Sequence, residues 1–177
     1  MGKKFDPGSP AILLDADVVI HFGKGSQIFL LPKIFPDNEK LILDKVLSEL
    51  EVLPSTRQFA ANIINFKIAR KIDFGVDQQV KIEYARLIRK FDKGESACMA
   101  YCKFHNNILA SSNIKDVKAY CKVNNIKLLS TMDLLLEAYN SGLLSESDCD
   151  LFIYDVKSKG SILPCNTIAQ YIAMPKQ

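Results

Sequence analysis

Short apolar runs recur along the chain, and each of them is followed by a polar break. Four runs stand out: AILLD at 11–15, LILD at 41–44, NILAS at 107–111 and IKLLS at 126–130. They are too short for ordinary helices and rich in leucine and isoleucine, which favours strands buried on both faces. We therefore predict four strands at these positions.

Longer stretches between the runs carry apolar residues at helical spacing. The segment 56–71, for example, places Phe59, Ile63 and Phe66 three or four residues apart. The pattern predicts helices over 16–31 (in part, because two glycines interrupt it), 45–53, 56–71, 77–91, 95–104, 116–123, 132–139 and 145–157. The tail 161–177 is expected to form a short helix packed on the body or a frayed end.

Strands that alternate with helices are typical of α/β proteins with a parallel sheet covered on both faces. We predict a three-layer sandwich around a central parallel sheet of about four or five strands. No linker or low-complexity segment divides the chain, so residues 1–177 are expected to form one domain with its core at about 11–145. Two further parts are predicted, a helical insertion at about 55–92 and a C-terminal helical extension at about 145–177.

Composition narrows the cellular setting. The chain has 177 residues, of which 48% are hydrophobic and 24% charged, and it shows neither a membrane-spanning run nor the apolar stretch of a secretion signal. Its five cysteines are an odd number without a Cys-x-x-Cys pair, which favours free thiols in a reducing compartment. We therefore expect a cytoplasmic protein with no membrane partner.

Four acidic residues follow or precede apolar elements. Asp15 ends the first run, Glu49 lies in the helix after the second, Glu95 opens a later helix, and Asp116 follows the third run. Clustered carboxylates near a core are costly unless a cation compensates them. Oxygen ligands of this kind suit a divalent cation, and in a parallel sheet ligands gather beyond the carboxyl ends of the strands. The pattern predicts one metal site.

Simpler roles exist for three of these acids. Glu95 and Asp116 could each stabilise a helix start through its dipole, and Glu49 could be a surface acid. Asp15 is harder to explain in this way, because it follows four apolar residues directly and is expected to lie near the core. Asp17 is a weaker candidate whose structural role would be to cap the segment 18–22.

The same residues, taken in order, resemble the PIN-domain nucleases over roughly residues 11–145. The resemblance rests on a strand ending in Asp, a Glu in the next helix, an acid opening a later helix, and a Ser-rich motif with Asn and Asp after a strand. In this chain these are ILLDADVVIHF, VLSELE, GESACMAYC and SSNIKDV, followed by IKLLSTMDLLLEAYNSGLL.

The resemblance implies a metal-dependent ribonuclease. Its acidic quartet, which would be both metal ligands and catalytic residues, would be Asp15, Glu49, Glu95 and Asp116, with Ser111 and Asn113 supporting the site. The ion would be Mg²⁺ or Mn²⁺ and the substrate single-stranded RNA. Some relatives are toxins held by a small antitoxin protein, and homodimers are common among them. The chain departs from the family in carrying Glu rather than the commoner Asp at 95, and no acid at Ile114.

Basic residues are concentrated in the middle of the chain, although the net charge is only +3. Most of them are expected to be solvated on helix faces. A subset is predicted to contact nucleic-acid phosphates, namely Lys67, Arg70, Lys71 and Lys115.

Two other functions stay open at this point. The run AILLDADVVI also resembles the first motif of haloacid-dehalogenase-type phosphatases, with Asp15 as nucleophile and Asp17 as acid and base. That function needs a late acidic pair at a strand end, and the only candidates, Asp148 and Asp150, lie in what is predicted to be a helix start. A PIN-like module that binds RNA or protein without catalysis is the third possibility.

Overall fold

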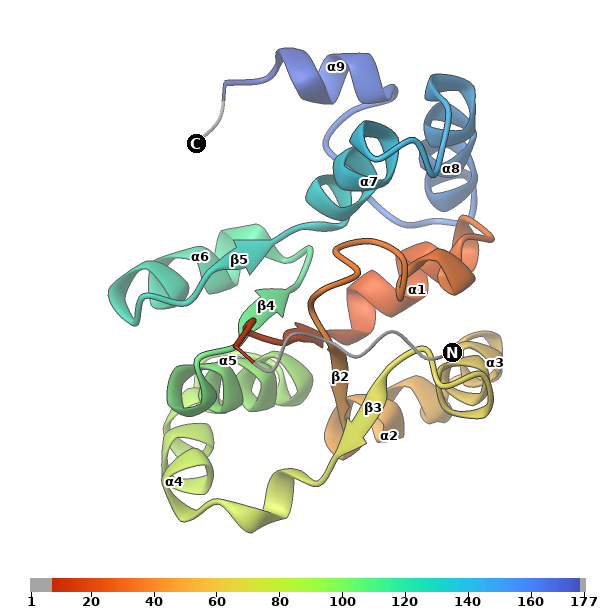
Figure 1. Ribbon diagram of the computed structural model, residues 1–177. Helices are drawn as coiled ribbons and strands as arrows, with labels where there is room; N and C mark the ends of the chain where they lie inside the picture. Colours follow the sequence, from red (N-terminus) through yellow and green to blue (C-terminus); the bar gives the residue numbers. More distant parts are fainter. Residues whose placement is uncertain (1–7, 176–177) are drawn as a thin grey trace.

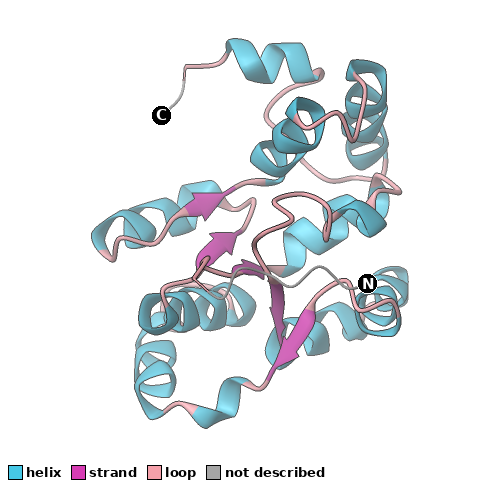
Figure 2. Ribbon diagram, viewed as in Figure 1, coloured by secondary structure: helices cyan, strands magenta, loops and turns pink. Residues whose placement is uncertain are grey.

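The computed structural model describes residues 8–175, so the ends of the predicted domain, 1–7 and 176–177, lie outside the described residues. Its centre is a single parallel sheet made of β1 (Ile12–Leu14), β2 (Lys40–Leu43), β3 (Arg70–Ile72), β4 (Ile108–Ala110) and β5 (Leu128–Leu129). The strand order is β3-β2-β1-β4-β5. Helices cover both faces, as Figure 2 shows. The predicted α/β sandwich with a parallel sheet is therefore confirmed.

Helices occupy most of the remaining chain. They are α1 (Ala16–Lys24), α2 (Asp44–Val52), α3 (Pro54–Asn65), α4 (Gln78–Leu87), α5 (Lys93–His105), α6 (Ile114–Val123), α7 (Thr131–Asn140), α8 (Glu146–Ser158) and α9 (Ile168–Ala173), with short 3₁₀ turns η1 (Ile28–Leu30) and η2 (Phe74–Val76). Among residues 8–175, no helix is long and apolar enough to cross a membrane.

The strand order places the helices in two layers. From β1 the chain moves through α1 to β2 on one side, whereas from β4 it moves through α6 to β5 on the other side. Because parallel crossovers are right-handed, α1 and α6 must cover opposite faces. Accordingly, α1 contacts α3, α7 and α8, and α5 packs on β1 and β4 beside α4 and α6 (Figure 1).

Burial explains why the sequence pattern located the central strands. All residues of β1, β2 and β4 are buried, because both faces of these strands are covered. Continuous apolar runs are the sequence signature of that environment. One polar residue joins them: Lys40 is buried at the start of β2, where its Nζ donates to the carbonyl oxygens of Phe35 (2.9 Å) and Asn38 (2.6 Å).

The prediction of one helix over 56–71 is wrong at its carboxyl end, and the predicted insertion at 55–92 is not wholly helical. Helix α3 stops at Asn65, Lys67 adopts a left-handed φ of 52°, and β3 pairs with β2 as the edge of the sheet. Arg70 and Lys71 are exposed there. An exposed edge strand needs no apolar run, so the strand pattern was absent from the sequence.

The partial helix predicted over 16–31 is confirmed: α1 ends at Lys24 and its C-cap is Gly25, although Gly23 lies within the helix. A Cβ on Gly25 would fall less than 3.0 Å from the Phe152 ring, so the turn and α8 pack closely there. The tail forms α9, which is tied to the body: Asp150 Oδ1 accepts from the Ile168 N–H (2.8 Å) and Tyr171 donates to Asp133 Oδ1 (2.7 Å). Of the two outcomes expected for the tail, the packed helix is the one found.

Candidate functional site

The strand order creates a switch point between β1 and β4, from which the two halves of the sheet are wound in opposite directions. In open α/β sheets, ligands bind beyond the carboxyl ends of the strands at such a point. Asp15 directly follows β1, and Ser111 directly follows β4. The backbone N–H of Asp15 donates to the Ala110 carbonyl (2.9 Å), so the two segments leave the sheet side by side.

Asp15 is held in place as the N-cap of α1. Its Oδ1 accepts from the Ala16 N–H at 2.8 Å, and the Cys98 thiol of α5 lies 3.9 Å from the same oxygen. The residue is 3% exposed. The carboxylate is thus fixed at the buried end of the central strand.

Gly94 leaves space in which the carboxylates of Glu49 and Asp15 lie close to the same backbone position. It is the second residue of α5, and a Cβ there would stand 3.6 Å from Asp15 Oδ1 and less than 3.0 Å from Glu49 Oε2. The two carboxylates therefore face the same point on α5, where the absence of a side chain leaves room for them. Glu49 reaches this point from α2.

Asn113 joins the other two acids of the predicted quartet. Its Nδ2 donates to Glu95 Oε1 and to Asp116 Oδ2, the latter at 2.8 Å. Asn113 is the N-cap of α6, yet its side chain makes no capping hydrogen bond. A side-chain amide carries two N–H donors, so one residue can hold two carboxylates near each other.

Asp17 completes the buried part of the site. Its Oδ2 accepts from the Ser112 N–H at 2.7 Å and lies 3.4 Å from Ser111 Oγ. Its Oδ1 is buried and has no hydrogen-bond partner among the described residues. A buried carboxylate oxygen without a partner is costly unless a proton or a cation compensates it.

These carboxylates raise one another's pKa. Burial, followed by the charge of Asp17, raises the pKa of Asp15 well above its ordinary value. Burial raises the pKa of Asp17 to about 6. For Glu49 and Glu95 the pKa is raised first by burial and then by neighbouring charges, which include Asp92 in both cases.

Asp92 is the residue that the sequence reading missed. It is the N-cap of α5 but makes no side-chain capping hydrogen bond. Its charge instead acts on Glu49 and Glu95. The signal was its position immediately before Lys93, three residues ahead of Glu95, but an Asp at a helix start is usually explained as a cap. We call the following residues the acidic cluster: Asp15, Asp17, Glu49, Asp92, Glu95 and Asp116.

A second buried acid shows how this fold compensates a structural charge. Glu83 receives a hydrogen bond from Arg86 (2.5 Å), another from the Tyr120 hydroxyl (2.7 Å) and an ion pair from Lys103 (3.2 Å). Burial opposes its ionisation, but these donors lower its pKa below the usual value. In the described part of the chain, no salt bridge reaches Asp15, Asp17, Glu49 or Glu95.

The oxygen atoms of the acidic cluster are suitable ligands for a hard divalent cation. They are carboxylate oxygens, the ligands that Mg²⁺ and Mn²⁺ favour, and one of them is the unpartnered Oδ1 of Asp17. Within residues 8–175, no three His, Cys, Asp or Glu side chains already form a group that could hold a metal. The contacts join the acids in two groups, Asp15 with Glu49 at Gly94 and Glu95 with Asp116 at Asn113.

The predicted phosphate contacts are divided between two ends of the sheet. Lys115 is exposed in the first turn of α6, next to Asp116. Lys67, Arg70 and Lys71 lie before or within β3, and Arg70 binds Glu39 through two hydrogen bonds of 2.6 and 2.9 Å. Because Arg70 is in register with the second residue of β2, it lies toward the amino ends of the strands. The structure does not bring these three residues to the acidic cluster.

Asp148 and Asp150, which the phosphatase alternative requires at a strand end, lie instead in α8. Asp148 Oδ2 accepts from the Ser145 N–H (2.9 Å), and Asp150 Oδ1 accepts from the Ile168 N–H that opens α9. Both acids therefore cap helices.

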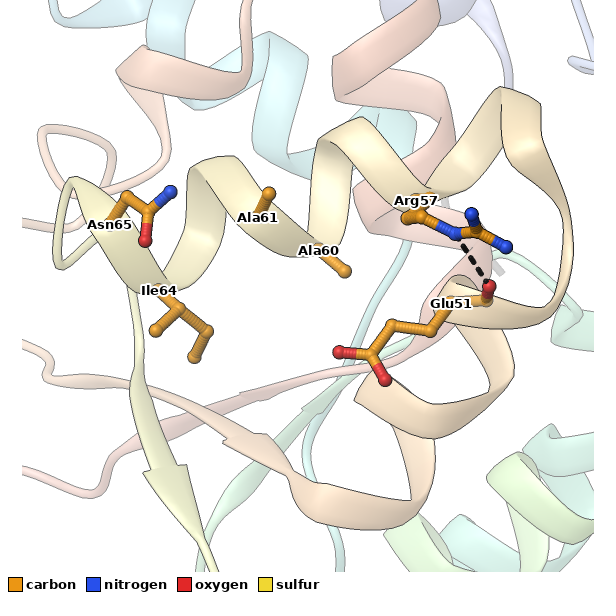
Figure 3. Close-up of a pocket in the computed structure, with 6 residues that line it drawn as sticks. All are labelled: Glu51, Arg57, Ala60, Ala61, Ile64 and Asn65. Atoms are coloured by element: carbon orange, nitrogen blue, oxygen red, sulfur yellow. Dashed lines mark hydrogen bonds between the residues drawn. The ribbon is translucent and has the colours of Figure 1, made fainter.

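A hollow in the surface lies away from the acidic cluster. Figure 3 shows a hollow along α3, lined by Glu51, Arg57, Ala60, Ala61, Ile64 and Asn65. The Arg57 side chain donates to the Glu51 carbonyl there (3.2 Å). No member of the acidic cluster lines this hollow. We base the functional argument on the acidic cluster, because that is where buried and uncompensated charge lies.

No protein-family model matches the chain, and no curated protein matches it.

The raised pKa of Asp17 predicts a pH-dependent cost of folding in metal-free buffer. Between the unfolded pKa of 3.8 and the folded pKa of about 6, the folded state holds a proton that the unfolded state has released. The contribution of Asp17 to wild-type stability therefore falls across this window and is constant above it. Relative to wild type, Asp17→Asn should gain almost nothing below pH 4 and about 3 kcal/mol above pH 6.

Urea unfolding of both proteins at several pH values, in the presence of EDTA, measures this difference. The comparison cancels groups that do not interact with Asp17, such as His21, whose pKa burial lowers to about 4. Asp15 does not cancel, because the charge of Asp17 raises its pKa, and the loss of that charge adds to the gain of the variant at higher pH. A difference that does not change with pH would show that Asp17 is not held as a buried charge.

Proposed function

We propose that the protein is a metal-dependent nuclease that hydrolyses phosphodiester bonds of single-stranded RNA. The observation that carries this proposal is the acidic cluster at the switch point of the sheet, with the buried and unpartnered Oδ1 of Asp17 inside it. Buried carboxylates close to one another do not stabilise the fold by themselves. A divalent cation bound among them would compensate their charge.

The residues would divide the work as follows. Asp15 supplies the most rigid carboxylate, while Glu49 and Glu95 are longer and less buried and can rotate toward the ion. Asn113 keeps Glu95 and Asp116 together, and the Ser111–Asn113 loop holds Asp17. When bound, Mg²⁺ or Mn²⁺ polarises the phosphoryl oxygen and acidifies a coordinated water.

No side-chain nucleophile is needed in this account. Phosphoryl transfer depends mainly on positioning and on neutralising charge. The role of Asp92 would be to add negative charge beside Glu49 and Glu95 and so strengthen their attraction for the cation. Glu95 at the third acidic position has one methylene more than the Asp common in PIN domains, and Asn113 restrains that longer arm.

The choice of RNA as substrate comes from the resemblance to PIN-domain nucleases. Lys115 is the predicted phosphate contact that stands next to the acidic cluster, and it would guide the strand into the site. The other three predicted contacts lie away from the acidic cluster. An RNA molecule bound at the cluster would reach them only if it extended past the edge of the β-sheet; they are Lys67, Arg70 and Lys71. A small antitoxin partner, a homodimer and a cytoplasmic location belong to the same proposal.

Cleavage of end-labelled single-stranded RNA by the purified chain tests the proposal. We expect internal cleavage with Mn²⁺ or Mg²⁺ and none with EDTA. Hydrolysis of phosphomonoesters with an acid-stable label trapped on Asp15 would favour the phosphatase alternative. RNA binding without cleavage under any metal condition would favour a non-catalytic module and would contradict the nuclease.

A further inference from the structure

A chain of hydrogen bonds that is buried at one end connects His21 of α1, through α7 and the loop after β4, to Asp17 of the acidic cluster. His21 Nδ1 lies 2.9 Å from Thr131 Oγ1, and Thr131 Oγ1 lies 2.5 Å from Ser112 Oγ. The Thr131 N–H donates to Ser112 Oγ at 3.1 Å. Ser112 in turn donates its backbone N–H to Asp17 Oδ2 at 2.7 Å. The chain thus runs from the interior of the α1–α7 contact to a carboxylate of the site.

We propose that His21 is a positioning residue, whose Nδ1 ends this chain and thereby fixes the Ser111–Asn113 loop on Asp17. The proposal rests on the proposed metal-dependent function, because the loop it fixes also carries the contacts to Glu95 and Asp116. The resemblance assigned supporting roles to Ser111 and Asn113 but none to His21. His21 lies one helical turn after Asp17 in α1.

The donors and acceptors along the chain can be assigned in one consistent direction. Ser112 Oγ accepts from the Thr131 N–H, so its own hydroxyl proton is available for Thr131 Oγ1. In this direction the Thr131 hydroxyl donates to His21 Nδ1, and Nδ1 acts as the acceptor. An imidazole that accepts at Nδ1 carries its proton on Nε2 and is uncharged.

The surroundings of His21 agree with an uncharged ring. The residue is 7% exposed, and Thr131 is fully buried. Burial, and then the nearby charge of Lys24, lowers the pKa of His21 to about 4. The ring is therefore neutral at physiological pH, and one of its two nitrogens is an acceptor.

The hydrogen-bond chain from His21 ends at the carboxylate of Asp17, a member of the acidic cluster, and this distinguishes it from a purely structural hydrogen bond. Asp17 has one oxygen held by Ser112 and one that is buried without a partner. If the Ser112 N–H moved, the carboxylate could rotate, and the free oxygen would no longer face a defined direction. Partners behind a metal ligand of this kind typically change metal affinity by about 10- to 100-fold.

His21→Phe tests the proposal, because it keeps an aromatic ring but removes the acceptor. His21→Asn is the conservative variant, since its side-chain amide places an acceptor near the position of Nδ1. Phe22→Leu is the matched control, a change at a neighbouring fully buried residue of α1 outside the hydrogen-bond chain. The variants are compared by the Mn²⁺ dissociation constant, by amide hydrogen exchange of Ser112, and by melting temperature.

We expect His21→Phe to weaken Mn²⁺ binding by about 10- to 100-fold and to lower the protection of the Ser112 amide, with His21→Asn restoring both in part. Phe22→Leu should lower the melting temperature without either effect. Unchanged Ser112 protection or unchanged Mn²⁺ affinity in His21→Phe overturns the proposal, as does an equal loss of affinity in Phe22→Leu.

Ser112 protection needs no metal, so failure of the proposed function is distinguishable from failure of this inference. If wild type binds no Mn²⁺ while His21→Phe still loses Ser112 protection, the metal-dependent function fails, whereas the fixing of the loop by His21 stands. If wild type binds Mn²⁺ and His21→Phe binds it equally well, only the positioning role fails.

Discussion

Asp15→Asn is expected to lower metal-dependent RNA cleavage by at least about 100-fold, more than the loss typical of a partner behind a metal ligand. Asp15 is the most buried member of the acidic cluster and ends the central strand. An asparagine keeps the shape and an oxygen for the Ala16 N–H, but it removes the charge that would bind the cation. Cleavage of labelled RNA at several Mn²⁺ concentrations measures the effect.

The same variant should be more stable than wild type in metal-free buffer above neutral pH. Burial and the charge of Asp17 raise the pKa of Asp15, so the ionised carboxylate opposes folding there. Added Mn²⁺ should raise the melting temperature of wild type but not that of the variant, because only wild type binds the ion. A loss of activity together with a gain of stability separates a functional charge from a structural one.

Asp44→Asn is the matched control for this experiment. Asp44 also follows a buried strand, β2, but its Oδ1 accepts from the N–H groups of Lys45 (2.8 Å) and Phe74 (3.1 Å), outside the acidic cluster. The control should keep its activity and gain no stability. Wild-type cleavage in Asp15→Asn would mean that the activity belongs to another site or to a contaminant.

Gly94→Ala is expected to reduce Mn²⁺ affinity and cleavage by about 10- to 100-fold, without loss of stability. The new Cβ would fall less than 3.0 Å from Glu49 Oε2, which must move away, and would contact Asp15 Oδ1. Because the atom that the Cβ meets is the end of a long side chain on an exposed residue, Glu49 can turn away without a shift of the backbone. Alanine also favours the helix over glycine, by about 0.5–1 kcal/mol.

Isothermal titration with Mn²⁺ and urea unfolding measure the two halves of this prediction. Gly75→Ala is a suitable control, since a Cβ there would also meet a carboxylate, that of Asp73 at 3.2 Å, but away from the acidic cluster. Equal Mn²⁺ affinity in Gly94→Ala and wild type would show that Glu49 does not bind the ion where the structure places it.

The sequence was sufficient for the features that depend on continuous apolar burial. The runs that became β1 and β4 are buried on both faces, and such burial leaves a plain pattern of leucine and isoleucine. The position of Asp15 followed from this, because an acid that ends such a run has to lie at the carboxyl edge of the sheet. The exposed strand β3 left no comparable pattern.

The parts of the site that escaped prediction depend on contacts distant in sequence. Asp92 has the ordinary pattern of a helix cap, and only its surroundings show that it faces Glu49 and Glu95. The hydrogen bond between His21 and Thr131 joins residues 110 positions apart, and the one between Ser112 and Asp17 joins residues 95 positions apart. The sequence grouped three basic residues by their charge alone, namely Lys67, Arg70 and Lys71. In the structure, Arg70 binds Glu39 at the edge of the sheet through two hydrogen bonds.

If one cation site unites these carboxylates, diffraction at the manganese absorption edge from Mn²⁺-soaked crystals will locate the ion. We expect an anomalous peak within about 2–2.6 Å of oxygens from Asp15 and at least one of Glu49 and Glu95. A clear map with no peak there, or with Mn²⁺ bound only at other acids such as Asp148, would contradict it.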